Sequence, residues 1–375
     1  MTHPGLIVLL GSGETSPSGR KVLEQAMRRM PAPPQVALLE TPAGFELNSD
    51  KVIGRVADFI THRLQNYAPQ VSVIPARRRL TKYSPDDPEL IRPLYQADLI
   101  FMGPGSPSYA VRQLRESRAW DALLARHRLG ATMVFASAAV VAISLFALPV
   151  YEIYKVGEDL HWKPGLDFFG MYGLPLIFIP HWNNNDGGAE LDTSRCFMGQ
   201  IRFAELMTML PPELTIVGID EKTALIMDPN QGVCHVSGHG GVTLIHIGPE
   251  HSGASSQDQL SGTGLGQVAE YRGSHIHQFN DGESFSLSRI GNFHYPVPGA
   301  GISQEIWQEA LRISQIAPAH DEKPSAEVLN LVEARKDARS RKDWLASDQL
   351  RDQIASLGWM IQDTPDGQQV SKKPT

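Results

Sequence analysis

The sequence predicts an α/β fold with helices wound over both faces of a mostly parallel sheet, extended by further β-strands and a small C-terminal helical module. Apolar runs at 5–10, 36–40, 97–102 and 131–135 are each followed by a turn and then by a helical stretch. Strands that are apolar at every position are typical of a parallel sheet covered on both faces. Because strand, turn and helix alternate, we expect a doubly wound sheet with its loops gathered at one edge.

The first strand, 5–10, ends in Gly11-Ser-Gly-Glu14 and leads into a helix over 19–30. This turn lacks the third glycine of the dinucleotide fingerprint, and we expect no cofactor. The turn follows a strand end, where α/β proteins bind ligands, so Glu14 is a substrate-binding candidate; ordinary turn chemistry is the other interpretation. Further strands are expected at 71–74, 150–156, 174–179, 215–220, 223–228, 232–237 and 242–248, and further helices at 50–66, 194–209 and 303–313.

Composition divides the chain into three parts. Residues 1–301 form the predicted α/β domain, in which the Gly-, Ser- and Gln-rich stretch 249–273 is expected to be a mobile loop. A β-hairpin is expected from 275–279 and 284–290. Residues 302–324 supply a helix and a polar linker. Residues 325–375 carry an apolar stripe on a helical hairpin, which predicts a separate module near the lower size limit of a domain.

Charge and cysteine content narrow the classes of function. The net charge of −7 does not point to nucleic-acid binding by the chain as a whole. Cys196 and Cys234 have no CxxC spacing, and no apolar run approaches the length of a membrane span. We therefore expect a cytoplasmic protein without a membrane partner, and a buried Cys196, with a low-pKa thiol as the alternative. No metal is expected, because no fixed acidic partner accompanies the histidines His235, His239, His246, His275 and His277.

Ser137 lies between the apolar strand 131–135 and a second apolar run with helical character. A nucleophile on a sharp strand-to-helix turn needs small neighbours, and alanines flank this serine on both sides. The free N–H groups of the following helix would also stabilise an oxyanion. The alternative is a serine that merely caps the helix.

His181 follows the strand 174–179, and the histidine and Ser137 are expected at the same edge of one parallel sheet. A serine needs a base, and the base needs an acid that fixes its tautomer. We expect Glu152 to be this acid, because it falls within a strand whose end can face the site; Glu158 is the alternative. The oxyanion donors are expected to be the N–H groups of Ala138 and Gly105, since Pro104 has no N–H.

Several motifs, in order over residues 5–248, resemble the cyanophycinase and alpha-aspartyl dipeptidase family of serine peptidases. They are Phe101-Met-Gly-Pro-Gly-Ser-Pro-Ser-Tyr-Ala-Val-Arg-Gln-Leu114, Ala136-Ser-Ala-Ala139, Pro180-His-Trp182, Arg195, Arg202 and Gly218-Ile-Asp-Glu-Lys-Thr-Ala224. The resemblance implies a class I glutamine-amidotransferase-like fold, Ser137 as nucleophile, His181 as base and an acidic residue upstream of His181. It also makes Arg195 and Arg202 candidates for binding a small peptide or amide substrate.

The turn at the nucleophile departs from the family pattern. The family usually has Gly-x-Ser-Ala-Gly, whereas this chain reads Phe135-Ala-Ser-Ala-Ala139, with alanine at the downstream glycine. An alanine in a close-packed glycine position would relax the turn and aim the hydroxyl poorly. The first alternative to a hydrolase is therefore a binding protein of the same fold without catalysis.

The tail resembles the C-terminal, tRNA-binding end of cysteinyl-tRNA synthetase. The resemblance rests on Glu333-Ala-Arg-Lys-Asp-Ala-Arg339, Lys342-Asp-Trp344, Ala346-Ser-Asp348, Leu350-Arg-Asp352, Leu357-Gly358 and Asp363-Thr-Pro-Asp-Gly367. It makes Arg335, Arg339 and Lys342 tRNA-binding candidates; the alternative is a solvated helix with intrahelical ion pairs. The expected partners are thus a small peptide or amide substrate, tRNA at the tail, and a second copy of the chain in a homodimer.

Overall fold

The computed structural model describes residues 3–248, 274–316, 325–364 and 367–372. The predicted mobile loop 249–273 and the linker 317–324 lie outside these ranges. The helices are α1 (Pro17–Met27), α2 (Ser49–Arg63), α3 (Pro88–Ile91), α4 (Pro107–Leu114), α5 (Arg118–Arg128), α6 (Ala138–Ala142), α7 (Gly199–Thr208), α8 (Gln304–Ile316), α9 (Ala326–Ser340) and α10 (Trp344–Ser356). The strands are β1 (Ile7–Leu10), β2 (Gln35–Leu39), β3 (Gln70–Ile74), β4 (Leu99–Met102), β5 (Thr132–Ala136), β6 (Phe146–Ala147), β7 (Lys163–Pro164), β8 (Leu176–Ile179), β9 (Thr215–Ile219), β10 (Thr223–Asp228), β11 (Val233–Gly238), β12 (Gly241–Ile247), β13 (Ser274–Asn280), β14 (Ser284–Ser286), β15 (Trp359–Thr364) and β16 (Gly367–Lys372).

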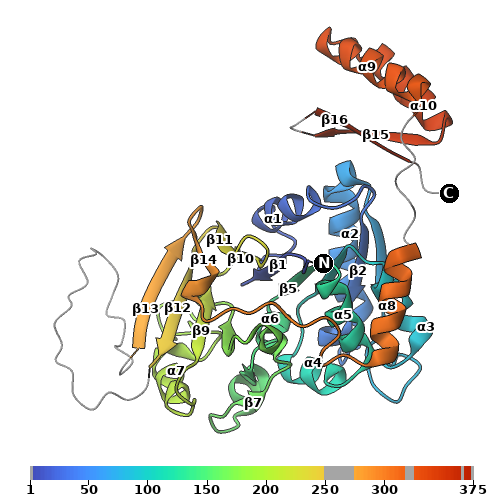
Figure 1. Ribbon diagram of the computed structural model, residues 1–375. Coiled ribbons are helices and arrows are strands. Elements are labelled where there is room, and N and C mark those ends of the chain that lie inside the picture. The colour runs from blue at the N-terminus through green and yellow to red at the C-terminus, as the bar shows by residue number, and fades with distance from the viewer. Residues whose placement is uncertain (1–2, 249–273, 317–324, 365–366, 373–375) are drawn as a thin grey trace.

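The largest sheet has the strand order β14-β11-β10-β1-β5-β4-β2-β3. Its strands β1, β5, β4, β2 and β3 run parallel, while β10, β11 and β14 extend the sheet antiparallel. The centre of the parallel part forms because β1, β4 and β5 are buried at every position and therefore need cover on both faces, whereas β3 at the edge of the sheet is mostly exposed. The predicted α/β class with a mostly parallel, doubly wound sheet is confirmed (Figure 1).

Alternate residues of the same strand enter two different cores. In β1, Ile7 and Leu9 join the core under α4, α5 and α6, while Val8 and Leu10 join the core under α1 and α2. Side chains alternate between the faces of a strand, so a strand apolar at every position supplies both cores. The carboxyl ends of these strands are therefore fixed from both sides, and Ser137 follows one of them.

A second sheet has the order β13-β12-β9-β8, in which β8 and β9 are parallel. The predicted hairpin of 275–279 and 284–290 is wrong, because β13 pairs with β12 and β14 pairs with β11. The two strands instead contact each other through side chains: the rings of Phe279 and Phe285 stack with centroids 4.0 Å apart. Burial of these two rings between sheets replaces edge-to-edge pairing.

The segment 150–156, predicted to be a strand, is helical and contains a π-helical turn over Glu152–Val156. Its buried apolar residues Val150 and Ile153 are three apart, a spacing that fits one face of a helix. The turn ends at Gly157, which has a φ of 85°. The helix moves Glu152 away from the strand end where the sequence analysis expected it.

The two sheets meet at a seam formed by the end of β1 and the loop after β9. The Gly11 N–H donates to the Thr223 carbonyl at 2.9 Å within the large sheet, and the Trp182 N–H donates to the Ile219 carbonyl at 3.1 Å within the second sheet, so the loop between β9 and β10 connects the two sheets at this point. A Cβ on Gly11 would lie 2.2 Å from the Asp220 carbonyl oxygen, so only glycine allows this approach. The expectation that Ser137 and His181 share one sheet is wrong: β5 and β8 belong to different sheets whose carboxyl ends converge at this seam.

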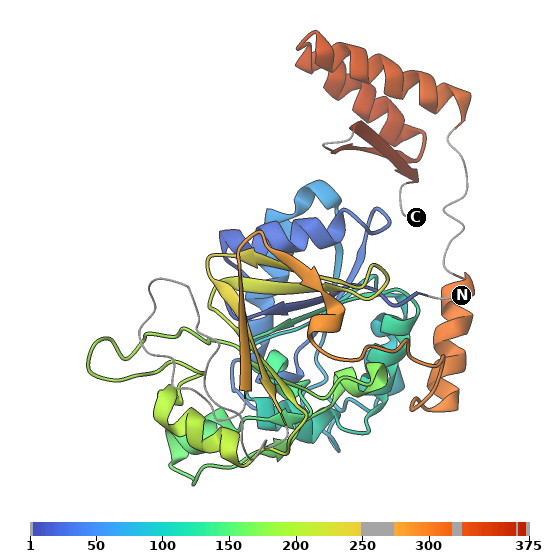
Figure 2. The ribbon, with the colours of Figure 1, turned by 60° about the vertical axis from the view of Figure 1, so that its left-hand side comes forward.

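The C-terminal part has two packing environments. Helix α8 packs on the large body, where Ile306 and Ala310 join its core and Glu305 pairs with Arg118 at 2.6 Å. Beyond the linker, α9 and α10 lie side by side over the β15–β16 hairpin, as Figure 2 shows, with a small core of Val328, Ile354 and Trp359. The expected C-terminal helical module is confirmed, while the domain boundaries remain predictions. No helix in the described ranges is long and apolar enough to cross a membrane.

Candidate active site

Ser137 occupies a sharp turn between β5, which ends at Ala136, and α6, which begins at Ala138. Its φ of 52° and ψ of −114° are unfavourable for a residue with a side chain and cost about 1–3 kcal/mol. The Ser137 N–H donates to the Leu10 carbonyl at 3.1 Å, which holds the turn against β1. The hydroxyl makes no capping hydrogen bond to α6, so the helix-cap interpretation is wrong.

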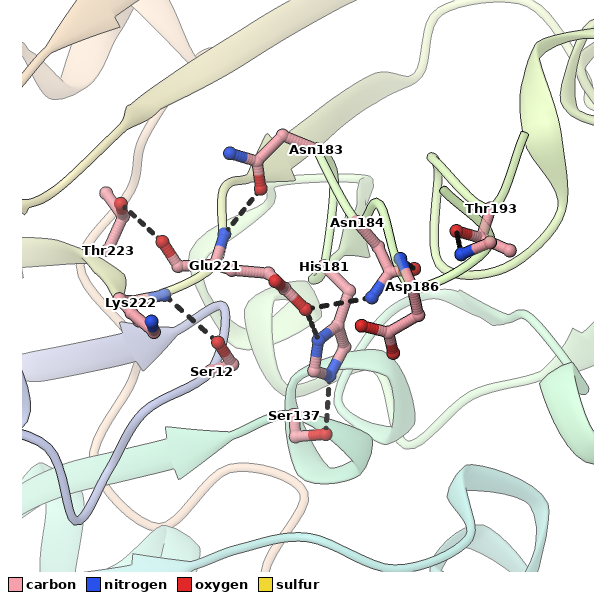
Figure 3. Close-up of polar contacts among 11 residues, drawn as sticks. Ser12, Ser137, His181, Asn183, Asn184, Asp186, Thr193, Glu221, Lys222 and Thr223 are labelled. Carbon is pink, nitrogen blue, oxygen red and sulfur yellow. Dashed lines mark hydrogen bonds and ion pairs between the residues drawn. The ribbon is translucent and has the colours of Figure 1, made fainter. Parts of the chain in front are cut away.

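The hydroxyl instead contacts the imidazole of His181. Ser137 Oγ lies 2.9 Å from His181 Nε2, and His181 Nδ1 lies 3.0 Å from Glu221 Oε1 (Figure 3). The relaxed turn expected from Ala139 is not observed, because the hydroxyl is aimed at the imidazole. An alanine at this position is compatible with the turn: Ala139 is fully buried in the large core.

Glu221 is held in its ionised form. The hydrogen bond from His181, followed by a smaller contribution from the Asn184 amide, lowers the pKa of Glu221 to about 2 although burial opposes the shift. An ionised carboxylate only accepts hydrogen bonds, so Nδ1 must carry the imidazole proton. A neutral imidazole in this tautomer has a free lone pair on Nε2, directed at the Ser137 hydroxyl.

Two asparagines fix Glu221 in place. The buried Asn184 donates from Nδ2 to Glu221 Oε1 at 3.0 Å, and Asn183 Oδ1 accepts the Glu221 N–H at 2.8 Å. On the other side, the Lys222 N–H donates to Ser12 Oγ at 3.0 Å. These bonds tie the loop after β9 to the loops after β8 and β1.

The predicted acid, Glu152, does not reach His181. It pairs with Lys163 at 3.0 Å on the helical turn described above, and the alternative, Glu158, lies 3.7 Å from His161. Glu221 is not among the residues predicted from the sequence, because the acid is expected there between the serine and the histidine. One signal could have found it: Glu221 follows β9, the parallel neighbour of the strand that carries His181.

A cavity of about 460 Å³ opens beside Ser137 and His181. Both predicted oxyanion residues, Gly105 and Ala138, line it. Gly105 has a φ of 143°, and a Cβ there would lie 2.0 Å from the Pro42 carbonyl oxygen, so the approach of this loop requires glycine. The other lining residues are mostly apolar or aromatic: Pro107, Val141, Val150, Tyr151, Tyr154, Lys155, Pro180, Asp186, Cys196 and Phe197.

The three predicted substrate-binding residues do not line this cavity. Arg195 donates to the Trp182 carbonyl at 3.0 Å, and its guanidinium lies 3.8 Å from the centroid of the Trp182 ring. Arg202 donates to the carbonyls of Met198 and Phe197 at 2.7 and 2.9 Å. Both arginines therefore stabilise the turn before α7, in which three successive residues have a positive φ. Glu14 lies in the turn after β1, outside the cavity lining.

Cys196 belongs to that turn and is buried. Burial raises the pKa of its thiol to about 12, so the low-pKa thiol alternative is wrong. Within the described residues, no group of three or more histidine, cysteine or acidic side chains is arranged to hold a metal ion.

The tRNA-binding candidates in the module differ in availability. Arg335 is only 4% exposed and forms two parallel hydrogen bonds to Asp363, at 2.8 and 3.0 Å. It therefore stabilises the module and cannot serve as a free surface cation. Arg339 lies 3.3 Å from the same carboxylate and 5.4 Å from the Trp344 ring, while Lys342 is exposed.

Comparison with known proteins separates the two parts of the chain. Residues 321–370 match the family model of the cysteinyl-tRNA ligase anticodon binding domain. The chain is 46% identical over 56 residues to the cysteine–tRNA ligase of Methanosarcina mazei, which covers 15% of this chain and 12% of that protein. It is 53% identical over 45 residues to the enzyme of Chlamydia caviae, covering 12% and 10%. The chain thus spans only about an eighth of the length of these curated relatives.

The large body resembles a solved peptidase in fold. A crystal structure of a peptidase from an acI-B1 Actinobacterium superposes with a TM-score of 0.54 and 20% identity, covering 76% of this chain and 97% of that one. The resemblance of the large body to a peptidase fold and of the tail to the end of cysteinyl-tRNA synthetase are both confirmed at this level.

Proposed function

We propose that the large domain is a serine hydrolase that cleaves a peptide or amide bond, with Ser137 as nucleophile, His181 as base and Glu221 as the acid. The observation that carries the proposal is the continuous hydrogen-bond chain from Ser137 Oγ through the imidazole to Glu221, beside a cavity. Nucleophile, base and orienting acid within hydrogen-bond reach are the arrangement that acyl transfer needs. The peptidase fold of the structural relative agrees with this chemistry.

In the first half of the reaction, His181 Nε2 takes the hydroxyl proton while Ser137 Oγ bonds to the substrate carbonyl carbon. The N–H groups of Gly105 and Ala138 donate to the oxyanion; Ala138 is the first residue of α6, so its N–H has no partner within the helix. When the C–N bond breaks, the imidazolium returns the proton to the leaving amine. Glu221 stabilises the imidazolium throughout and keeps its own ionised form.

In the second half, a water molecule gives a proton to His181 and its oxygen attacks the acyl carbon. The C–Oγ bond then breaks, and the proton returns to Ser137. Substrate and water are together converted into an acid and an amine, with the enzyme unchanged.

The test is labelling of the full chain by a fluorophosphonate probe, with the modified residue identified by peptide mass spectrometry. We expect the label on Ser137, and Ser137→Ala should remain folded but unlabelled. Ser340→Ala, which removes a surface hydroxyl of the C-terminal module, should label like the wild type. Absence of label on the folded wild type would favour the alternative of a non-catalytic binding protein.

The match to an anticodon binding domain supports a second candidate function, binding of tRNA through the C-terminal module. Trp344 is 56% exposed, with the Arg339 guanidinium near its ring and the exposed Lys342 close by in sequence. An exposed aromatic ring beside cations is the combination that stacks on unpaired bases and pairs with phosphate.

Fluorescence anisotropy of the full chain with labelled tRNA tests this function. Replacing a stacking aromatic residue costs roughly 1–3 kcal/mol, so Trp344→Ala should weaken binding about tenfold or more. Lys342→Ala should lower the slope of log K against log salt by about one. Leu345→Ala, at an exposed apolar neighbour, is the matched control and should have little effect. Unchanged affinity in Trp344→Ala, or no binding at low salt, would reject this function.

A further inference from the structure

Asp186 stands out among the cavity residues because nothing in the described part of the chain pairs with its carboxylate. The Asp186 N–H donates to Asn184 Oδ1 at 3.2 Å, and Asn184 is the same residue that holds Glu221. The position of Asp186 is therefore fixed by the network that orients His181. In Figure 3 its carboxylate points from the loop toward the side chain of His181, and Ser137, His181 and Asp186 line one cavity.

Asp186 is an exposed residue of the mostly apolar cavity lining, and its carboxylate has no partner in the described part of the chain, so it is free to bind a cation of the substrate. A substrate ammonium group would form charge-assisted hydrogen bonds with it, and would keep the carboxylate paired when the bound substrate shields it from water. The cation nearest to the scissile carbonyl in any peptide is a free α-amino group on the residue that supplies this carbonyl. Asp186 thus suits a substrate cleaved after its N-terminal residue.

The other residues that line the cavity indicate which kind of side chain the N-terminal residue of the substrate carries. The Phe197 and Tyr154 rings contact each other with centroids 5.4 Å apart, and Phe197 also lies 5.9 Å from His181. Val141, Val150 and Tyr151 continue this surface. The wall beside the imidazole is thus aromatic and aliphatic.

The two arginines of the region do not suit an acidic side chain in this position. Arg195 and Arg202 are bound to backbone carbonyls outside the cavity lining. Lys155 lies at the cavity rim, where it and Tyr151 also border a neighbouring cavity, and its ammonium lies over the Tyr154 ring at 5.1 Å. Lys155 thus lines the cavity on the side that is shared with its neighbour, and its contact with the Tyr154 ring places it apart from the Phe197 ring beside His181.

From these contacts we infer that the substrate has a free N-terminal amino group, bound by Asp186, on a residue with an apolar or aromatic side chain that packs against Tyr154 and Phe197. This inference rests on the proposed function, because it places the carbonyl of that residue at Ser137. It makes the enzyme an aminoacyl-releasing hydrolase that excludes N-blocked and acidic N-terminal residues.

Binding can be measured without turnover by calorimetry on the full-length Ser137→Ala protein. We expect Phe-Ala to bind about 10- to 100-fold more tightly than N-acetyl-Phe-Ala, which leaves Asp186 unpaired, and at least tenfold more tightly than Asp-Ala. Equal affinity for the free and acetylated peptides, preference for Asp-Ala, or no binding of any of the three would overturn the inference.

Two further variants in the Ser137→Ala background identify the residues responsible. Asp186→Asn should remove the preference for the free amine, whereas Glu190→Gln, the same charge change on an exposed part of the same loop, should preserve it. Tyr154→Ala should weaken Phe-Ala binding, and Tyr154→Phe should restore it. A retained free-amine preference in Asp186→Asn would remove Asp186 from the proposal.

The same peptides separate this inference from the proposed function. If Phe-Ala binds as expected but the wild type neither hydrolyses it nor reacts with the probe, recognition of the amino group by Asp186 stands as ligand binding, and the hydrolase proposal fails. If the wild type hydrolyses an activated ester through Ser137 but prefers N-blocked peptides, the hydrolase proposal stands and the substrate inference fails.

Discussion

Two carboxylate pairs, one in each part of the molecule, have similar hydrogen bonds and different surroundings. In the α/β body, Glu221 binds one nitrogen of His181 and leaves the other directed at Ser137 beside the cavity. In the C-terminal module, Asp363 binds both terminal nitrogens of Arg335, which is almost completely buried. The Glu221–His181 pair orients an imidazole that can still take a proton from Ser137. The Asp363–Arg335 pair leaves the guanidinium buried, where it stabilises the module and is not free to bind a ligand.

The comparison teaches that a charged residue is available for function only when its charged group has an unpaired side on a cavity or surface. Arg335, which was selected from the sequence, fails this condition because Asp363 pairs with it, and Glu152 is held by Lys163 outside the lining of the cavity beside Ser137. Asp186 has such an unpaired charged group, although it is not among the residues selected from the sequence. The following experiments change one member of each pair.

The largest effect is expected from Glu221→Gln. The glutamine carries no negative charge to stabilise the imidazolium, and its NH2 group can donate to Nδ1 and favour the wrong tautomer of His181, so kcat/KM should fall by roughly 10²–10⁴. Glu152→Gln, at the acid selected from the sequence, is the matched control and should change kcat/KM by less than about threefold, the range of an ordinary surface change. Equal losses in both variants would remove Glu221 from its proposed role.

A smaller effect, on stability alone, is expected from Arg335→Ala. The change leaves Asp363 without its main partner and should destabilise the module by about 2–3 kcal/mol. Hydrogen exchange of the full chain would show this as lost protection in α9 and β15 with unchanged protection in β5. Lys336→Ala removes an exposed cation of the same helix and should have little effect. Unaltered exchange in Arg335→Ala would mean that the buried pair contributes nothing.

The smallest effect concerns pH. The pKa of Glu221 is about 2 in the folded protein and ordinarily 4.5, so the ionised form is favoured by folding. The stabilisation is complete above about pH 4.5 and is lost as pH falls toward 2. The difference in Tm between wild type and Glu221→Gln should therefore be constant from pH 7 to about 5 and shrink below that. Glu190→Gln should show no such trend, and a difference that grew on acidification would contradict the assigned pKa shift.

The order of elements could be predicted from the sequence because the central strands β1, β4 and β5 are largely apolar and buried, and the strands alternate with amphipathic helices. Errors arose where local pattern and packing disagree. Residues 150–156 alternate as a strand does, but Val150 and Ile153 are buried together on a helical turn. The turn at Asp281-Gly282 suggests a hairpin, yet each flanking strand pairs with an earlier strand of its own sheet.

The serine and histidine of the candidate site could be predicted because each follows a buried strand and carries a distinctive side chain. Glu221 and Asp186 could not be selected with the same reasoning, since acidic residues in loops are common and only tertiary contacts distinguish them. Glu221 is defined by the pairing of β8 with β9, and Asp186 by Asn184, whose amide links the two loops. Arg195 and Arg202 were predicted to bind the substrate and do not line the cavity. Their guanidinium groups instead donate to backbone carbonyls of the turn before α7.

Ser137 follows a strand of one sheet, His181 follows a strand of the other, and Glu221 lies in the loop from β9 to β10 that joins them, so the 2.9 Å contact between Oγ and Nε2 also depends on how the two sheets are docked. The contact that sets this docking is at Gly11, where an added methyl group would meet the Asp220 carbonyl. A mutation there would touch neither the nucleophile nor the base, yet would shift the loop that carries Glu221 relative to the turn that carries Ser137. The alignment of Ser137 with His181 therefore depends on how the two sheets pack together. Residues that do not line the cavity, such as Gly11, can change this alignment.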